Sequence, residues 1–484
     1  MRVEFDRARR VSELFPRVPV YISTPPGRRR IMRVGTRHIY ADLPYSHLLI
    51  HFMVRASKEA DTAEEVRTRW EEFFREYGHL WTFEGKPFVK VLVRSRPRGR
   101  AGRTLVLKID WVVFLSYLEK RAEEAVRRAR YGSKKGTESS VREFCEAYYD
   151  VWTPMYLLIL TKLKWQRFEP ITSRDVQEFK LRERTRFLKL LRLTGDYEAI
   201  ERGMDRVEAA IRELEDLLRP EVGLYALAPV IQRLHSDLAV LRSMTLNEAN
   251  FVGAYSSLRK ILESLAKMCV ILDEISKLCE NENINTGEEN LCKGLNEAKR
   301  VFLKLLAANL VLELDFIIRE TKPCEIGDWR KSVEEIAKDL RHVFIENLLW
   351  NSSLSSEEKG RILWERYSEY VDDKSRRWRP LKLDSKRINN ALASLLGRAG
   401  RKSVAGRCRF DRLYAICSEA VHAISPPPHY SLLEAKLFRY FLQWFAEALE
   451  VATKSFTEVF YTFISPHGES SGQIEGENLL RLWY

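Results

Sequence analysis

The chain has 484 residues, 45% of them hydrophobic, which is enough for two to four domains with buried cores. Its formal net charge of +13 favours polyanionic partners such as nucleic acid. The start of the chain lacks the apolar stretch of a signal peptide, and the two most apolar windows, Met155–Leu163 and Val301–Ile318, are too short or too charged to span a bilayer. We therefore expect a cytoplasmic protein without a membrane partner.

The positive charge is concentrated in one part of the chain. Residues 1–135 contain 30 Lys and Arg against 16 Asp and Glu, a net charge of +14. Residues 136–484 contain 51 against 52, a net charge of −1. This split predicts a basic nucleic-acid-binding domain at 1–135, because charge that served only solubility would be spread evenly.

Residues 1–135 are expected to fold as an α+β domain with antiparallel strands. Helical periodicity covers Thr62–Tyr77 and Trp111–Arg130, and a turn is expected at Glu84-Gly85. The strand candidates are Val18–Ser23, Arg30–Val34, His38–Leu43, His47–Arg55, Trp81–Phe83, Pro87–Val93 and Thr104–Asp110.

A short arginine-rich stretch joins the last two strand candidates, which predicts a β-hairpin with a basic tip. Its arginines are Arg94, Arg96, Arg98, Arg100 and Arg103. Guanidinium groups match phosphate oxygens, so this tip suits the backbone or a groove of nucleic acid. The alternative is a solvated loop. Two further clusters extend the basic surface of the domain: Arg28, Arg29 and Arg30, and Arg127, Arg128 and Arg130.

The rest of the chain is expected to be helical, with a connecting region at 136–248 and a multi-helix bundle at 249–484. Gly195-Asp196 breaks one helix from the next, and Phe251–Leu278 carries a continuous apolar stripe. The helix candidates are 139–165, 174–193, 197–218, 251–278, 291–321, 329–350, 356–370, 385–397, 410–424 and 431–464.

Residues 374–409 form a second basic island, with twelve Lys and Arg and one acidic residue. It contains Arg376, Arg377 and Arg379 around Trp378, which lies in a polar loop and can stack on an unpaired base. Trp81 and Trp111 fall inside strand and helix patterns and are expected in the core.

No metal site and no cofactor are expected, because the sequence has no CxxC, HExxH or Walker A motif. His47 and His51 are four residues apart but fall in a predicted strand. Cys279 and Cys292 flank a polar loop. The sequence leaves open whether they form a disulfide or remain free thiols. Few glutamines and 31% charged residues are typical of a thermophile.

Candidate chemistry lies near His422. It follows Glu419 by three residues on one predicted helix, so the carboxylate can orient the imidazole. Such a pair fits general acid–base work, with Arg412 supplying charge. The alternative, which the sequence favours, is a structural histidine at the helix end.

From Asn250 on, the chain resembles the helical HEPN-like domains of prokaryotic defence and toxin systems. The resemblance is carried by Ala254–Glu263 (AYSSLRKILE) and Leu413–His422 (LYAICSEAVH). It implies a helical bundle, often dimeric, whose active members cleave RNA through an Arg and a His four to six residues apart. Here Arg412 precedes His422 by ten positions, which favours a binding or dimerising member.

These features favour a nucleic-acid-binding protein of low sequence specificity with a helical assembly domain, acting in defence or nucleic-acid metabolism. Arginine clusters bind DNA and RNA alike, so the choice between them stays open. The alternatives are a metal-independent HEPN-like ribonuclease in antiviral defence and a subunit of a larger ribonucleoprotein such as a CRISPR effector. A homodimer or a nucleoprotein complex is the expected assembly.

Overall fold

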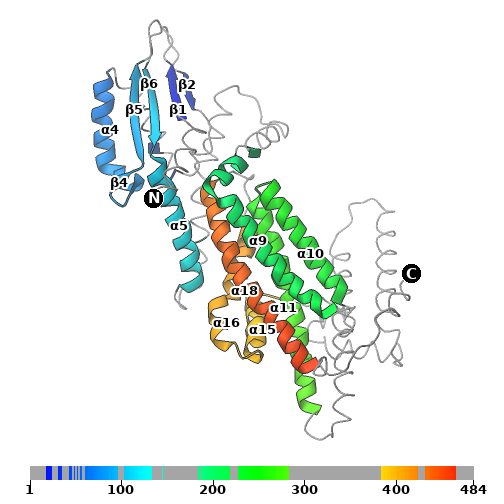
Figure 1. Cartoon of the computed structure of the whole chain (residues 1–484). Coiled ribbons are helices and arrows are strands. Elements are labelled where there is room, and N and C mark those ends of the chain that lie inside the picture. Colours follow the sequence, from blue (N-terminus) through cyan, green and yellow to red (C-terminus); the bar gives the residue numbers. More distant parts are fainter. Residues whose placement is uncertain are drawn as a thin grey trace, which may run out of the picture. The chain divides into compact units, whose positions relative to one another are not determined.

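The computed structural model confirms the predicted fold class. It is mainly helical, and antiparallel strands occur in the N-terminal part (Figure 1). The described residues are 18–23, 31–34, 43–45, 48–49, 52, 55–56, 60, 62–95, 103–132, 144, 184–185, 187–218, 227–282, 383–422 and 431–464. No helix within these ranges is long and apolar enough to cross a membrane.

The chain forms two compact units, each assembled from segments far apart in sequence. Unit 1 comprises Met1–Asp205, Val240–Ser256 and Ile416–Trp444. Unit 2 comprises Arg206–Ala239, Ser257–Ala415 and Phe445–Tyr484. The domains expected at 1–135, 136–248 and 249–484 follow the chain in order and stay a prediction.

Unit 1 contains a four-stranded antiparallel sheet in the order β2-β1-β6-β5. Its strands are β1 (Val18–Ser23), β2 (Ile31–Val34), β5 (Val89–Ser95) and β6 (Arg103–Ile109). The expected hairpin is confirmed, since β5 and β6 pair over their full length from Val89 opposite Ile109 to Ser95 opposite Arg103.

The turn expected at Glu84-Gly85 is also confirmed. It joins two short antiparallel strands, β3 (Thr82–Phe83) and β4 (Lys86–Pro87). Glu84 and Gly85 both have positive φ angles, 49° and 74°. This backbone conformation favours glycine and matches the twist of a tight hairpin.

The two N-terminal helices begin at side-chain caps. Helix α4 (Ala63–Tyr77) begins after Thr62, whose hydroxyl accepts from the Glu65 amide at 3.1 Å. It packs beside β5 (Figure 1). Helix α5 (Trp111–Tyr131) begins after Asp110, whose carboxylate accepts from the amides of the first turn. Both helices match their predicted ranges.

The strand predicted over His47–Arg55 is wrong. The described residues of this segment are helical, and Leu49, Phe52 and Ala56 are all buried. Their spacing of three and four residues fits one face of a helix. A short apolar window fits the period of a strand as well as that of a helix. The helix is stabilised here by the ring contacts of Phe52 with Trp70 and Phe73 on α4. Of the strand expected at His38–Leu43, only Leu43 belongs to the described residues, and it lies in a bend.

The helical part of unit 1 packs through large aromatic side chains. Phe251 and Tyr255 of α11 (Phe251–Glu282) contact Phe438 of α18 (Leu432–Ile464), with ring centroids 5.0 and 5.3 Å apart. Gly203 of α9 (Asp196–Arg212) lies against Leu442, where an added Cβ would come within 2.9 Å of the leucine side chain. The break predicted at Gly195 is confirmed, since Gly195 has a φ of +76° and α9 begins at the next residue.

Unit 2 contains parts of α9, α11 and α18 and several further helices. These are the 3₁₀ helix η3 (Glu213–Leu218), α10 (Ala228–Arg242), α15 (Ser385–Arg398), α16 (Lys402–Cys408) and α17 (Phe410–His422). Arg206 donates to both carboxylate oxygens of Glu450 at 2.7 and 2.9 Å, which ties α9 to α18. The expected helices at 291–321, 329–350 and 356–370 lie outside the described residues.

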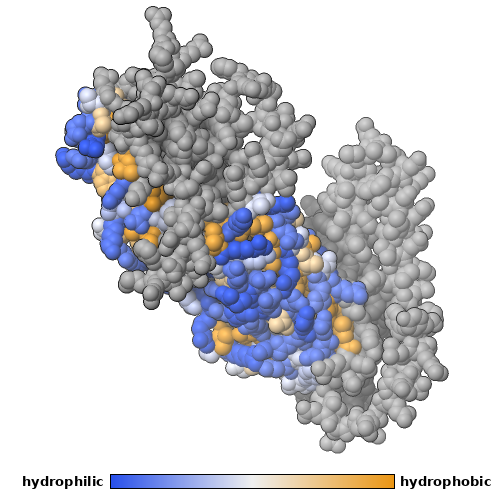
Figure 2. Space-filling model, turned by 45° about the horizontal axis from the view of Figure 1, so that its top comes forward, coloured by the Kyte–Doolittle hydropathy of each residue, from blue (hydrophilic) through white to orange (hydrophobic). Residues whose placement is uncertain are grey.

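The apolar stripe expected along α11 is buried as predicted. Its members Leu258, Leu262, Leu265, Cys269 and Leu272 are all at most 2% exposed. Cys269 is a free thiol, whose pKa is raised by burial. On the face seen in Figure 2, the described residues are mostly hydrophilic, with small separate hydrophobic spots.

Candidate functional site

Two connections of the unit 1 sheet lie at the same end of its strands. β1 runs antiparallel to β6, so its last residue, Ser23, lies at the end of the sheet where β6 begins with Arg103. Ser23 also lies opposite Ile31, the first residue of β2. The connections 24–30 and 96–102 therefore both leave and rejoin the sheet at this end, which we call the arginine edge.

Six of the predicted phosphate-binding arginines belong to these two connections. Arg94 and Arg103 lie at the strand ends, while Arg28, Arg29, Arg30, Arg96, Arg98 and Arg100 lie outside the described residues. Neighbouring strands are about 4.8 Å apart, so the midpoints of the two hairpins are about 10 Å apart at the arginine edge. Two clusters far apart in sequence are thus attached side by side.

The third predicted cluster lies elsewhere. Helix α5 starts beyond the opposite end of the sheet and runs about 30 Å away from it, given its 21 residues (Figure 1). Arg127 and Arg128 are exposed near its C-terminal end. Arg130 is half-buried, with its guanidinium 5.9 Å from the ring of Trp444. The structure therefore does not bring this cluster to the arginine edge.

The tryptophans divide as expected where they are described. Trp81 and Trp111 are buried, and the Trp81 indole donates to the carbonyl of Pro44 at 2.7 Å. Trp378 and its neighbours Arg376, Arg377 and Arg379 lie outside the described residues. Their role as a stacking and phosphate-binding loop stays a prediction.

The candidate chemical residues near His422 are distributed along α17. Glu419 is exposed. Arg412, a charged residue that a helix usually presents to solvent, is fully buried. The difference arises because α17 is covered on more than one side, with Phe410 and Leu413 equally buried. Burial lowers the pKa of Arg412. The side chain of His422 is outside the described set.

The two segments that carry the HEPN-like resemblance meet in unit 2. The Tyr414 hydroxyl on α17 donates to Glu263 on α11 at 2.8 Å, and Arg259 donates to the same carboxylate oxygen at 2.9 Å. The Arg259 guanidinium also lies 5.1 Å from the Tyr414 ring. Contacts between residues 151 positions apart thus join the opening of α11 to α17.

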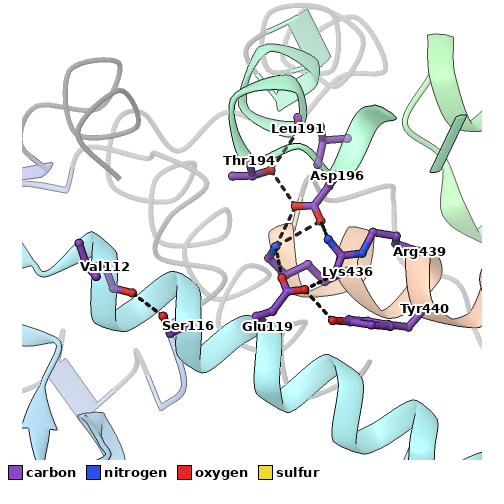
Figure 3. A network of polar contacts seen from close by, with 9 residues as sticks. All are labelled: Val112, Ser116, Glu119, Leu191, Thr194, Asp196, Lys436, Arg439 and Tyr440. Atoms are coloured by element: carbon purple, nitrogen blue, oxygen red, sulfur yellow. Dashed lines mark hydrogen bonds and ion pairs between the residues drawn. The ribbon is translucent and has the colours of Figure 1, made fainter. Parts of the chain in front are cut away.

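A second polar site lies in unit 1, where two cations are held between two carboxylates (Figure 3). Lys436 Nζ contacts Asp196 Oδ2 at 2.9 Å and Glu119 Oε2 at 2.7 Å. Arg439 donates to Asp196 Oδ1 at 2.7 Å and also to Glu119. The Tyr440 hydroxyl donates to Glu119 Oε1 at 2.6 Å. We call these residues the ion cluster: Glu119, Asp196, Lys436, Arg439 and Tyr440.

Burial and charge set the ionisation of this cluster. Burial raises the pKa of Glu119, but the charges of Lys436 and Arg439 and the hydrogen bonds from Lys436 and Tyr440 outweigh it and lower the pKa to about 2. Burial and the hydrogen bond to Glu119 raise the pKa of the Tyr440 phenol well above its usual range. The phenol therefore stays protonated and donates to an ionised carboxylate.

The ion cluster borders a cavity of about 530 Å³ in unit 1. Glu119, Lys436 and Arg439 contribute to its lining, together with Thr194, the 83–84 segment and a polar face of α5. The Thr194 hydroxyl donates to Asp196 at 2.7 Å and so helps to hold the innermost carboxylate.

Sequence reasoning missed the ion cluster. One local signal was present, since Lys436, Arg439 and Tyr440 have the spacing of one helical face. The partners Glu119 and Asp196 lie far away in the chain and follow no spacing rule. Tertiary structure alone identifies them.

In the ranges that the structure describes, no group of His, Cys, Asp and Glu side chains has the arrangement of a metal site. No protein-family model, curated protein or solved structure matches this chain.

Proposed function

We propose that the protein binds nucleic acid through the phosphate backbone, with the arginine edge as the contact surface and the helical region serving assembly. The observation that carries the proposal is the sheet order, which attaches the connections 24–30 and 96–102 to one edge. The net charge of +14 in residues 1–135 supports it, because phosphate neutralisation supplies most of the affinity of non-specific binding.

The low sequence specificity follows from the chemistry of the contacts. Phosphate oxygens are the same at every nucleotide, so guanidinium groups that contact them position the protein without reading bases. We expect duplexes of scrambled sequence to bind with equal affinity within about twofold at one salt concentration. A site-specific protein would instead discriminate by orders of magnitude.

The test measures fluorescence anisotropy with labelled DNA and RNA across a salt series. The variant reverses Arg96, Arg98 and Arg100 to Glu and leaves Arg94 and Arg103, which belong to the β5–β6 ladder. We expect affinity to fall about tenfold or more, and the slope of log K against log salt to become shallower by about 2 to 3.

A matched control reverses the same number of charges outside the basic clusters. Arg75, Lys189 and Lys454 are exposed and lie on α4, the helix before Gly195 and α18. Their reversal to Glu should change affinity far less than the tip variant, because a phosphate contact needs close approach and distant charges are screened. Equal losses of affinity in the two variants would show that the arginine edge is not the contact surface.

A second function, metal-independent RNA cleavage, draws on the contact between the two HEPN-like segments. RNA would then be cleaved by the wild-type protein in EDTA, and His422→Ala would abolish the cleavage while leaving the salt-dependent binding intact. Intact RNA after prolonged incubation with the wild-type protein would remove this function and leave the binding proposal untouched.

A further inference from the structure

The donors of the ion cluster form one set on one helix. Lys436, Arg439 and Tyr440 follow one another at i, i+3 and i+4 on α18, so they project from the same face. All three donate to the carboxylate of Glu119 (Figure 3). Two cations and a phenol that converge on one carboxylate are the donors expected around a bound oxyanion.

The two carboxylates of the cluster are not equivalent. The Asp196 side chain is 0% exposed and lies behind the cations, held by Thr194. The Glu119 side chain is 37% exposed and lies on the cavity side, on a different helix from the donors. Asp196 is therefore a fixed counter-ion, whereas Glu119 can leave the donors by side-chain rotation into water.

Charge balance defines what could replace Glu119. Lys436 and Arg439 carry two positive charges, and Asp196 neutralises one of them. The remaining single positive charge is balanced by Glu119. In the part of the chain that the structure describes, the buried Nε of Arg439 has no hydrogen-bond partner.

We infer that Lys436, Arg439 and Tyr440, beside this cavity, form a binding site for a singly charged oxyanion, either a carboxylate or a phosphodiester. In the structure, the carboxylate of Glu119 from the same chain occupies the position of this ligand. Glu119 is thus a built-in competitor for the site. A ligand that enters the cavity of about 530 Å³ takes over the hydrogen bonds from Lys436, Arg439 and Tyr440. The inference is independent of the proposed nucleic-acid binding, since the arginine edge plays no part in it.

The test compares the wild-type protein with Glu119→Gln. The amide has nearly the same shape as the carboxylate but no charge, so it competes poorly for the two cations. The probes are acetate and dimethyl phosphate, titrated at constant ionic strength against chloride and followed by calorimetry and thermal shift. We expect Glu119→Gln to bind at least one probe about tenfold more tightly than the wild type, and the preferred probe identifies the ligand class.

Two further variants make the outcome decisive. Adding Lys436→Met to Glu119→Gln should abolish the gain, because it removes one of the two cations. Glu198→Gln, an exposed residue on α9 that does not line the cavity, should bind like the wild type. If Glu119→Gln does not fold, Glu119→Asp takes its place, since its shorter side chain reaches the donors less well and should raise affinity to a smaller extent. Equal affinities for the wild type and the Glu119 variant, or no binding by either, would overturn the inference.

Discussion

At the scale of single residues, the ion cluster shows how charged side chains are tolerated in a protein interior. Asp196 and Lys436 are almost completely buried, which carries a high desolvation cost for each charge taken alone. The cost is offset because each buried charge has an opposite charge within 3 Å and Asp196 accepts a further hydrogen bond from Thr194. Removing one member should therefore cost much more than removing an exposed ion pair.

We predict that Asp196→Asn lowers the free energy of unfolding by about 3 to 5 kcal/mol, because Lys436 and Arg439 would share a single carboxylate in a buried site. Urea unfolding followed by circular dichroism measures the loss. The control is Glu198→Gln, which removes an exposed carboxylate two residues away and should change stability by about 0.5 kcal/mol or less. An Asp196→Asn variant as stable as the wild type would show that the cluster does not need its inner carboxylate.

The lowered pKa of Glu119 leads to a prediction about acid stability. Its pKa is about 2 in the folded protein against an ordinary value of 4.5, so the folded state holds the carboxylate ionised. The stabilisation from this group is complete above pH 4.5 and is lost as the pH falls towards 2. The urea midpoint of the wild type should therefore fall more steeply over this range than that of Glu119→Gln. Parallel pH profiles of the two proteins would contradict the assignment.

At the scale of elements, the best predictions came from segments whose local chemistry agrees with their packing. Thr62 and Asp110 begin α4 and α5 as N-caps, and the apolar residues of each helix recur at the period of a helix. In the β5–β6 hairpin, the β-branched residues Val89, Val91 and Val93 of β5 lie opposite Ile109, Leu107 and Leu105 of β6. The segment around Leu49 was predicted wrongly because its short apolar run fits the strand period as well as the helix period.

The β3–β4 turn offers a test of backbone strain without a steric clash. Gly85 has a φ of +74°, and an added Cβ would have no atom within 4 Å. Gly85→Ala should therefore destabilise the protein by about 1 kcal/mol through its backbone alone. Gly406→Ala is a matched control, since Gly406 lies inside α16 with equally open surroundings and without a positive φ. This second change should be neutral or stabilising by up to about 1 kcal/mol, as measured by thermal unfolding.

At the scale of the whole molecule, residues 1–135 contact helical segments far away in the chain through side chains. Unit 1 combines Met1–Asp205 with Val240–Ser256 and Ile416–Trp444. Within it, Glu119 of α5 meets Asp196 through two cations of α18. The charge excess of residues 1–135 thus belongs to a region that makes ion pairs through Glu119, and a cation–π contact between Arg130 and Trp444, with distant segments.

We predict that fragments 1–135 and 136–484 associate when they are co-expressed, because the α5 face with Glu119 retains its partners on α18. Co-purification through a tag on one fragment measures the association. Glu119→Lys should weaken the association, since a third cation would face Lys436 and Arg439. Glu71→Lys, at an exposed position of α4, should leave it unchanged. Two fragments that are each soluble and folded, as judged by circular dichroism, and yet never associate would contradict this prediction.

The sequence by itself determined the fold class, the ranges of α4 and α5, the apolar face of α11, the β-hairpin with its basic tip and the concentration of charge in residues 1–135. These properties depend on residues close together in the chain, where period, turn chemistry and charge are read directly. Tertiary structure alone decided that 24–30 and 96–102 share one sheet edge, that Arg412 is buried and that Glu119 and Asp196 meet on Lys436 and Arg439. Strand order, helix coverage and ion pairing over 240 and 317 positions are set by which surfaces pack together, and no local spacing rule encodes that choice.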